Sequence, residues 1–203
     1  LCITSELYLT GYPPRDLLER EGFVRETLAV RDALARDLAS MPAVLVGCVE
    51  PNTASAGKRL FNAAALLDGG RVVGVAHKSL LPTYDVFDER RYFEPGRSLT
   101  PLDFRGLRLG VSICEDIWND PEFWPERLYD KDPVEELCRS GAEVIVNLSA
   151  SPFTLSKRAL RPRMLAAAAR RHGRPLLFVN QVGGQDDLVF DGRSLAFDAA
   201  GEL

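Results

Sequence analysis

Apolar residues follow two different spacings in the first part of the chain. Between residues 22 and 40 they recur at helical intervals with charged residues between them, which predicts an amphipathic helix that ends before Met41-Pro42. Residues 43–49 form a continuous apolar run, which is typical of a buried strand, and residues 61–67 are another strand candidate. Asp68-Gly69-Gly70 then favours a hairpin turn into a further strand at 71–76.

Strands and helices alternate in the rest of the chain. Pro162 is expected to begin a helix that continues through His172 and ends at Gly173. Strands separated by helices, together with hairpins, indicate an α/β fold with a mixed sheet or a pair of sheets flanked by helices. Further strands are expected at 107–113, 144–148 and 176–180, and a short helix is expected at 133–140.

Composition and charge narrow the class of protein. A chain of 203 residues with 46% hydrophobic content is sufficient for one packed domain. The net charge is -4, and the basic residues form no block that could neutralise a row of phosphates, so no nucleic-acid partner is expected. No apolar run approaches the roughly 20 residues of a membrane helix and no leader pattern is present, so we expect no membrane partner and a cytoplasmic location.

The two ends of the chain suggest a fragment of a longer polypeptide. Leu1-Cys2-Ile3 reads as the interior of a strand, without a methionine or a turn signal before it. Residues 197–203 read as a strand that runs into a turn, without a helix or polar tail to close a domain. We therefore expect further chain on both sides.

Three ionisable side chains follow strand-like runs: Glu6, Lys78 and Cys114. Because strand ends bring distant residues to one rim in layered α/β proteins, these three are expected to converge. The long segment 80–102 has little regular pattern but many aromatic and charged residues, which is typical of functional loops. The four cysteines show neither close pairing nor CxxC spacing, so neither disulfides nor a metal site is expected.

A cysteine nucleophile needs a base, because an ordinary thiol is mostly protonated at neutral pH. His172 ends a helix, and His77 should point to the opposite face from Lys78, so a cysteine-histidine pair is only a weak alternative. Glu6 lies among apolar residues and can act as the base if burial raises its pKa. Lys78, with the backbone amide that follows the cysteine, would stabilise an oxyanion during attack on an amide or nitrile carbon.

Each of the three residues also has an ordinary structural interpretation. Glu6 could cap a helix, Lys78 could be a solvated strand end, and Cys114 could be a small core residue. The motifs around them favour the catalytic interpretation. The stretches 5–14, 77–82 and 113–118 resemble, in order and spacing, the three signature segments of the nitrilase, or carbon-nitrogen hydrolase, superfamily.

Further segments resemble a narrower group, the glutaminase domains of glutamine-dependent NAD+ synthetases. These segments are Gly11–Leu18, Tyr84–Phe93, Asn147–Phe153 and Asn180–Asp186. The resemblance covers nearly all of residues 1–203 and implies an α-β-β-α sandwich of two mixed sheets flanked by helices. It departs from the family at Ser5, where proline usually precedes the glutamate, and in the absence of the first strand and helix.

The resemblance implies a role for each matching residue. Glu6 would be the general base, Lys78 the oxyanion stabiliser and Cys114 the nucleophile on the side-chain amide of L-glutamine. Glu89 would orient the lysine, and Tyr12, Tyr84 and Phe87 would line the glutamine pocket. Glu115 and Ser151 would hold the amino-acid end of the substrate, and Lys157 would suit the substrate carboxylate.

The resemblance also implies partners. The glutaminase domain would need no cofactor, and its ammonia would pass to a C-terminal synthetase domain of the same polypeptide, which uses ATP and Mg2+ to amidate nicotinic acid adenine dinucleotide. We find no Ser-Gly-Gly-type ATP loop in these 203 residues. Superfamily members associate through their sandwich faces, so a homo-oligomer is expected. Two alternatives remain: a free-standing amidase acting on another small amide, and a non-catalytic assembly module.

Overall fold

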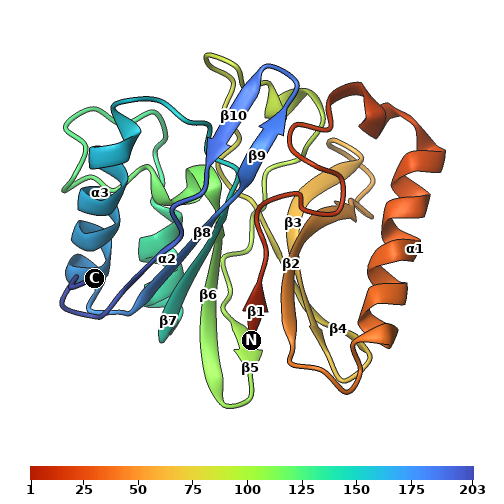
Figure 1. Ribbon diagram of the computed structural model, residues 1–203, viewed down its shortest axis with the longest axis horizontal. Helices are drawn as coiled ribbons and strands as arrows, with labels where there is room; N and C mark the ends of the chain where they lie inside the picture. Colours follow the sequence, from red (N-terminus) through yellow and green to blue (C-terminus); the bar gives the residue numbers. More distant parts are fainter.

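Two β-sheets face each other in the computed structural model, which describes residues 1–203 (Figure 1). The first sheet has the order β1 (Cys2–Ile3), β2 (Val44–Pro51), β3 (Leu60–Asp68) and β4 (Arg71–His77). The second has the order β11 (Leu195–Phe197), β8 (Leu176–Asn180), β7 (Val144–Ser149), β6 (Leu107–Ile113) and β5 (Leu102–Phe104). Both are mixed: β1 runs parallel to β2 in a sheet that is otherwise antiparallel, whereas β6, β7 and β8 are parallel between two antiparallel edge strands.

Helices cover the outer face of each sheet. Helix α1 (Glu21–Asp37) lies against the first sheet, while α2 (Pro133–Arg139) and α3 (Lys157–His172) lie against the second (Figure 1). Three short 3-10 helices occur in the connections, at Arg15–Glu19, Glu89–Arg91 and Cys114–Ile117. The predicted sandwich of two mixed sheets flanked by helices is confirmed. None of the helices combines the length and apolar composition that a membrane crossing needs.

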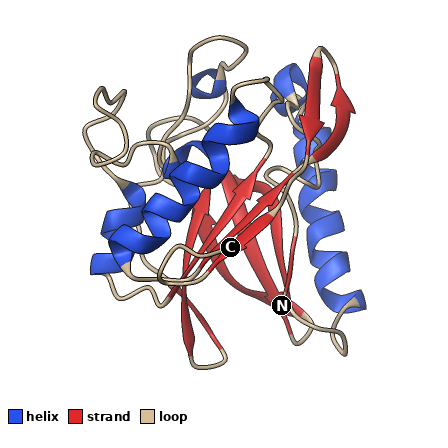
Figure 2. Ribbon diagram, turned by 60° about the vertical axis from the view of Figure 1, so that its left-hand side comes forward, coloured by secondary structure: helices blue, strands red, loops and turns tan.

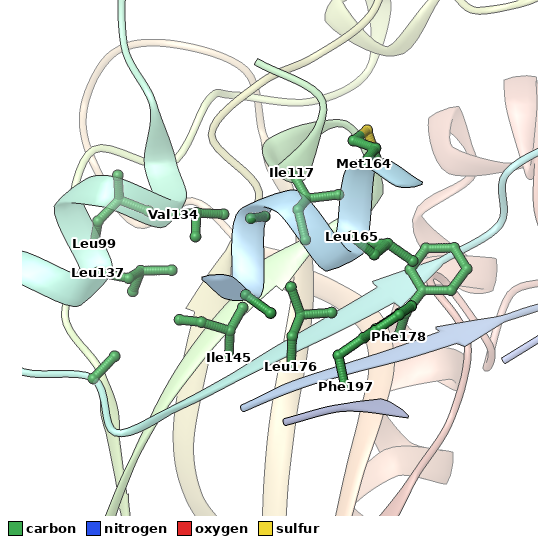
Figure 3. Close-up of a cluster of buried hydrophobic side chains, with 13 residues drawn as sticks. Leu99, Ile117, Val134, Leu137, Ile145, Met164, Leu165, Leu176, Phe178 and Phe197 are labelled. Atoms are coloured by element: carbon green, nitrogen blue, oxygen red, sulfur yellow. The ribbon is translucent and has the colours of Figure 1, made fainter. Parts of the chain in front are cut away.

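Successive residues of the central strands are buried on opposite faces, which explains their continuous apolar runs. On β2, Leu45 packs into the space between the sheets, and the next residue, Val46, packs in the cluster beneath α1. The largest cluster fills the space between the second sheet and helices α2 and α3, where Met164 and Leu165 meet Leu176 and Phe178 (Figure 3).

The prediction that Pro162 begins a helix is wrong, because α3 already begins at Lys157 and contains the proline. A proline at this position lacks the N–H that would bond to the carbonyl of Arg158, a loss that costs about 3 kcal/mol in a helix interior. The helix nevertheless continues because Arg161, Met164 and Leu165 are all buried against the rest of the molecule. Tertiary contacts therefore override the local signal.

A two-stranded hairpin was not predicted. Strands β9 (Val182–Gln185) and β10 (Leu188–Asp191) pair with each other as a separate sheet and project from the same end of the sandwich as the long loops (Figures 1 and 2). The carboxyl ends of β1, β4, β6 and β7 point to this end as well (Figure 1). The fold thus gathers the chemically informative segments at one end of the molecule.

Candidate active site

Two carboxylates enclose one lysine at this end of the sandwich. The Nζ atom of Lys78, which follows β4, donates to Oε1 of Glu6 and to Oε1 of Glu89, each at 2.7 Å. Glu6 and Lys78 are 0% exposed and Glu89 is 5% exposed. Asn62 of β3 donates to Glu6 Oε1 at 2.8 Å, and the hydroxyl of Tyr12 donates to Glu89 Oε1 at 2.8 Å. We refer to these five residues as the lysine cluster.

Close backbone packing places Glu6 in this cluster. Gly47 of β2 lies directly beneath the turn that carries Glu6, and a Cβ atom there would come within 2.6 Å of the Leu7 nitrogen and still closer to the Ser5 carbonyl oxygen. The amide of Gly47 also donates to Thr4 Oγ1 at 3.0 Å. The turn can therefore approach the strand only because residue 47 has no side chain.

Lys78 is fixed in a similar way from its backbone. Its amide donates to the Asn62 carbonyl oxygen at 2.9 Å, and its carbonyl oxygen accepts from Gly96 at 2.7 Å. The preceding residue, His77, turns its ring in another direction and stacks on Phe61 with 4.1 Å between ring centroids. His77 is thus directed away from the lysine, as strand alternation predicts, and His172 ends helix α3.

Cys114 lies where β6 gives way to a 3-10 turn, and it is 5% exposed. Its φ angle is +44°, in the left-handed region that costs a residue with a side chain about 1–3 kcal/mol. The thiol packs in the cluster between the two sheets. The charges of Glu6, Lys78 and Glu115 all act on its pKa, which places it within electrostatic reach of all three.

The electrostatics of the site keep the thiol protonated. Burial and the charge of Glu6 raise the pKa of Cys114 well above its usual range, and Lys78 opposes them. Burial alone would lower the pKa of Lys78, but the two carboxylates raise it well above its ordinary value. Burial also raises the pKa of Glu89 to about 7, although Lys78 acts in the opposite direction. A reaction at Cys114 therefore needs a base, and Glu6 is the carboxylate whose charge acts most strongly on the thiol.

A second group of residues surrounds Glu115, which directly follows the cysteine. The Tyr84 hydroxyl lies 2.8 and 2.9 Å from the two carboxylate oxygens of Glu115, and the Tyr129 hydroxyl donates to Oε1 at 3.3 Å. The ring of Phe87 meets that of Tyr84 edge to face at 5.5 Å. Burial raises the pKa of Glu115, and the Tyr84 hydrogen bond lowers it. We refer to Tyr84, Phe87, Glu115, Tyr129 and Lys157 as the glutamate-115 cluster.

Lys157 supplies the positive charge of this cluster. Its Nζ lies 5.5 Å from the centroid of the Trp118 ring. Burial lowers the pKa of Lys157, and the charges of Cys114 and Glu115 raise it. Lys157 and Glu115 thus both interact electrostatically with the thiol and with each other, and no salt bridge joins the two.

Ser151 belongs to the segment that follows β7, and this segment contacts the lysine cluster through its backbone. The amide of Ala150 donates to Glu6 Oε2 at 3.1 Å, and the amide of Ser151 donates to Asn180 Oδ1 at 2.9 Å. The buried guanidinium of Arg161 binds the Ser151 carbonyl oxygen at 3.1 Å and pairs with Asp191 at 2.7 Å. Ser151 is 2% exposed.

All ten residues proposed from the sequence lie in or beside these two clusters. Asn62 and Tyr129 were missed. Asn62 had a weak signal, since it is a polar residue inside an apolar strand, whereas Tyr129 lies in an irregular segment without a pattern. Nowhere do three or more His, Cys, Asp or Glu side chains gather in a way that could hold a metal ion.

Comparison with known proteins places this geometry in a family. The model of the carbon-nitrogen hydrolase family matches residues 1–203. The glutamine-dependent NAD(+) synthetase of Synechocystis sp. is 42% identical over 206 residues, which cover 100% of this chain and 37% of that protein. The chain therefore spans about a third of the length of the curated relatives that it matches.

Solved structures agree with the sequence comparison. The glutamine-dependent NAD+ synthetase of Acinetobacter baumannii, in complex with ADP, superposes with a TM-score of 0.83 at 34% identity over 98% of this chain and 35% of that one. A variant of the Nesterenkonia sp. AN1 amidase, with the acetamide moiety of fluoroacetamide covalently added at its active-site cysteine, superposes with a TM-score of 0.76 at 25% identity over 98% of this chain and 70% of that one. The chain belongs to the carbon-nitrogen hydrolase family.

Proposed function

We propose that this chain hydrolyses the side-chain amide of L-glutamine through a thioester on Cys114. The observation that carries the proposal is the lysine cluster, in which a fully buried ammonium and two carboxylates act electrostatically on the thiol of Cys114, a residue whose backbone has a positive φ angle. The covalent adduct on the active-site cysteine of the Nesterenkonia amidase supports the same kind of nucleophile.

The first half of the reaction forms the thioester. Glu6 takes the proton of the Cys114 thiol as the sulfur attacks the amide carbon, and the carbonyl electron pair moves to oxygen. The ammonium of Lys78 and the backbone amide of Glu115 stabilise that oxyanion. As the intermediate collapses, Glu6 returns the proton to the amide nitrogen, the carbon-nitrogen bond breaks, and ammonia leaves.

The second half regenerates the enzyme. Glu6 takes a proton from a water molecule, whose oxygen attacks the thioester carbon through a second oxyanion on the same two donors. The carbon-sulfur bond then breaks, the sulfur recovers its proton from Glu6, and glutamate leaves. Glu89 holds Lys78 in place throughout, with the Tyr12 hydroxyl bound to its carboxylate.

The glutamate-115 cluster suits the amino-acid end of L-glutamine. The carboxylate of Glu115 is charge-complementary to an α-ammonium group, and Lys157 is charge-complementary to an α-carboxylate. In this proposal Ser151 also holds the amino-acid end, and Tyr12, Tyr84 and Phe87 supply aromatic walls, of which Tyr84 and Phe87 meet edge to face. The opposite charges of Glu115 and Lys157 favour a zwitterionic substrate over a simple aliphatic amide.

Residues 1–203 are the glutaminase domain of a longer polypeptide in this proposal. Their ammonia serves a C-terminal synthetase domain, which uses ATP and Mg2+ to amidate nicotinic acid adenine dinucleotide to NAD+ in the cytoplasm. The match of the entire chain to about a third of a glutamine-dependent NAD(+) synthetase supports this role. The ADP bound in the Acinetobacter relative agrees with nucleotide use by the longer polypeptide.

The test compares ammonia release from L-glutamine and from propionamide, with a Cys114→Ala variant as the inactive control. We expect a higher kcat/KM for L-glutamine, no turnover by the variant, and labelling of Cys114 by the glutamine analogue 6-diazo-5-oxo-norleucine in peptide mass mapping. A preference for propionamide would instead identify a free-standing amidase. Absence of both turnover and label, with ATP and nicotinic acid adenine dinucleotide present, would indicate a non-catalytic module.

A further inference from the structure

Asp116 is a buried carboxylate outside the two clusters, and its exposed fraction is only 1%. Its hydrogen-bond donors are backbone amides. Oδ1 accepts from the amides of Ser79 and Leu80 at 3.0 and 2.8 Å, and Oδ2 accepts from the amide of Ile113 at 3.0 Å. Burial raises the pKa of Asp116 to about 6, and the three amides act in the opposite direction.

These three amides flank the two groups that must meet during the reaction. Ile113 directly precedes Cys114 at the end of β6, and Ser79 and Leu80 directly follow Lys78 at the end of β4. Strand β4 belongs to the first sheet and β6 to the second. One carboxylate therefore ties the nucleophile's strand to the lysine's strand across the interface between the sheets.

The backbone at Cys114 needs such a restraint. Its positive φ angle of +44° would relax toward a commoner conformation if nothing held it. The bond between Asp116 Oδ2 and the Ile113 amide closes the turn around the cysteine, whose carbonyl oxygen has a long 3.5 Å contact with Asn147 Nδ2. Asp116 thus acts both on the shape of the turn and on the distance between that turn and Lys78.

We propose that Asp116 is a positioning residue that holds the Cys114 sulfur at its working distance from the Lys78 ammonium by binding the backbone on both sides of the sheet interface. The inference rests on the proposed amide hydrolysis, in which sulfur attack and oxyanion stabilisation must occur on the same carbonyl group. Both carboxylate oxygens are needed as acceptors, so an amide side chain of the same size cannot replace them. Displacements of about 1 Å at a reaction centre cost about 100-fold in rate.

The matched variants are Asp116→Asn and Asp132→Asn. Asp132 is also buried and also accepts two backbone amides, those of Val134 and Glu135 at 3.1 Å each, but it caps helix α2. Asp116→Asn loses one of its two acceptors of backbone amides, and Asp132→Asn loses the charge that pairs with Arg171 at 2.9 Å, so both are expected to lower the melting temperature. Only Asp116→Asn should lower kcat for L-glutamine by about 100-fold per folded molecule, with KM within about threefold of the wild type.

A crystal structure of Asp116→Asn provides a readout that does not depend on activity. We expect the Cys114 sulfur to move by about 0.5 Å or more relative to the Lys78 nitrogen, with the wild-type distance kept in Asp132→Asn. If Asp116→Asn does not fold, Asp116→Ser, which keeps one short acceptor, takes its place in both measurements. An inactive wild type would refute the proposed hydrolysis and leave the crystallographic comparison to decide this inference.

Three results would overturn the role of Asp116. The first is a folded Asp116→Asn enzyme with kcat within about threefold of the wild type. The second is an equal loss of kcat in Asp132→Asn, which would indicate a general effect of stability. The third is a lower kcat with unmoved sulfur and nitrogen atoms, which would assign the effect to the lost negative charge and exclude positioning.

Discussion

The lysine cluster and the glutamate-115 cluster lie beside the same cysteine but are constructed in opposite ways. Glu6 and Lys78 are fully buried, stand at strand ends, and are fixed by bonds to Asn62 and the Ala150 amide. Glu115 is held by tyrosines from irregular segments, and one of them, Tyr84, is 42% exposed. Glu6 and Lys78 are thus held by buried bonds, whereas Glu115 is held by side chains from irregular segments, one of which is partly exposed. In the proposed reaction the first pair serves bond breaking and the second group serves recognition.

This difference predicts that chemistry and recognition can be damaged separately. Changes in the lysine cluster should act on kcat, because those groups touch the reacting atoms or hold the groups that do. Changes in the glutamate-115 cluster should act mainly on KM, because in the proposed reaction those groups contact a part of the substrate that does not react.

Glu6→Gln should show the largest difference between an effect on kcat and an effect on KM. Glutamine keeps the size of the side chain and an acceptor for Lys78, but it cannot take the thiol proton. We expect kcat for L-glutamine to fall by about 100- to 10,000-fold, in both thioester formation and thioester hydrolysis, with little change in KM. Stopped-flow and steady-state kinetics measure these steps, and near-normal rates would mean that another base does the work.

Tyr84→Phe should move KM instead. The variant loses a hydroxyl bonded to a carboxylate, a bond of the charged class worth about 1.5–3 kcal/mol, so we expect KM for L-glutamine to rise at least about tenfold with kcat nearly unchanged. Tyr92→Phe is the matched control, since its hydroxyl binds Asp16 on the exposed surface. If kcat of Tyr84→Phe fell as much as kcat of Glu6→Gln, the two clusters would not act separately on kcat and KM.

The smallest expected effect is on the pH dependence of stability, and it concerns a single residue, Glu89. Burial raises the folded-state pKa of Glu89 to about 7, above that of an unfolded carboxyl group. Folding then binds a proton, so this contribution to the free energy of unfolding is present at low pH and is lost as the pH rises through about 7.

Glu89→Gln should therefore show a smaller decline in unfolding free energy between pH 5 and 7.5 than the wild type, measured by urea denaturation. The exposed Glu26→Gln variant should keep the wild-type slope. Parallel slopes for Glu89→Gln and the wild type would show that Glu89 is already ionised throughout this range, and the electrostatic description of the lysine cluster would be wrong.

The three groups proposed for catalysis were more predictable from the sequence than the residues around them. Glu6, Lys78 and Cys114 each follow an apolar run, and such runs end at one rim for simple geometric reasons. The roles of Glu89, Glu115, Ser151 and Lys157 came only from resemblance to a family, because nothing local marks them.

Other features could not be predicted because tertiary contacts decide them. The β9–β10 hairpin contains Gly183 and Gly184, which hide the strand pattern, and it is anchored through Gln185 Nε2 to the Pro13 carbonyl oxygen at 3.3 Å. Helix α3 continues past its proline because of buried contacts far along the chain. Tyr129 reaches Glu115 from an irregular segment, in which Asn119 binds the Tyr129 carbonyl oxygen at 2.8 Å.

The most direct test of the account is to trap the thioester. The wild-type protein is mixed with L-glutamine, quenched with acid during turnover, and examined by intact-protein mass spectrometry and peptide mapping. We predict an added γ-glutamyl group on Cys114, present in the wild type and absent in Cys114→Ala. Steady ammonia release without any covalent adduct, or an adduct on a different residue, would contradict the central claim that the buried cysteine is the nucleophile.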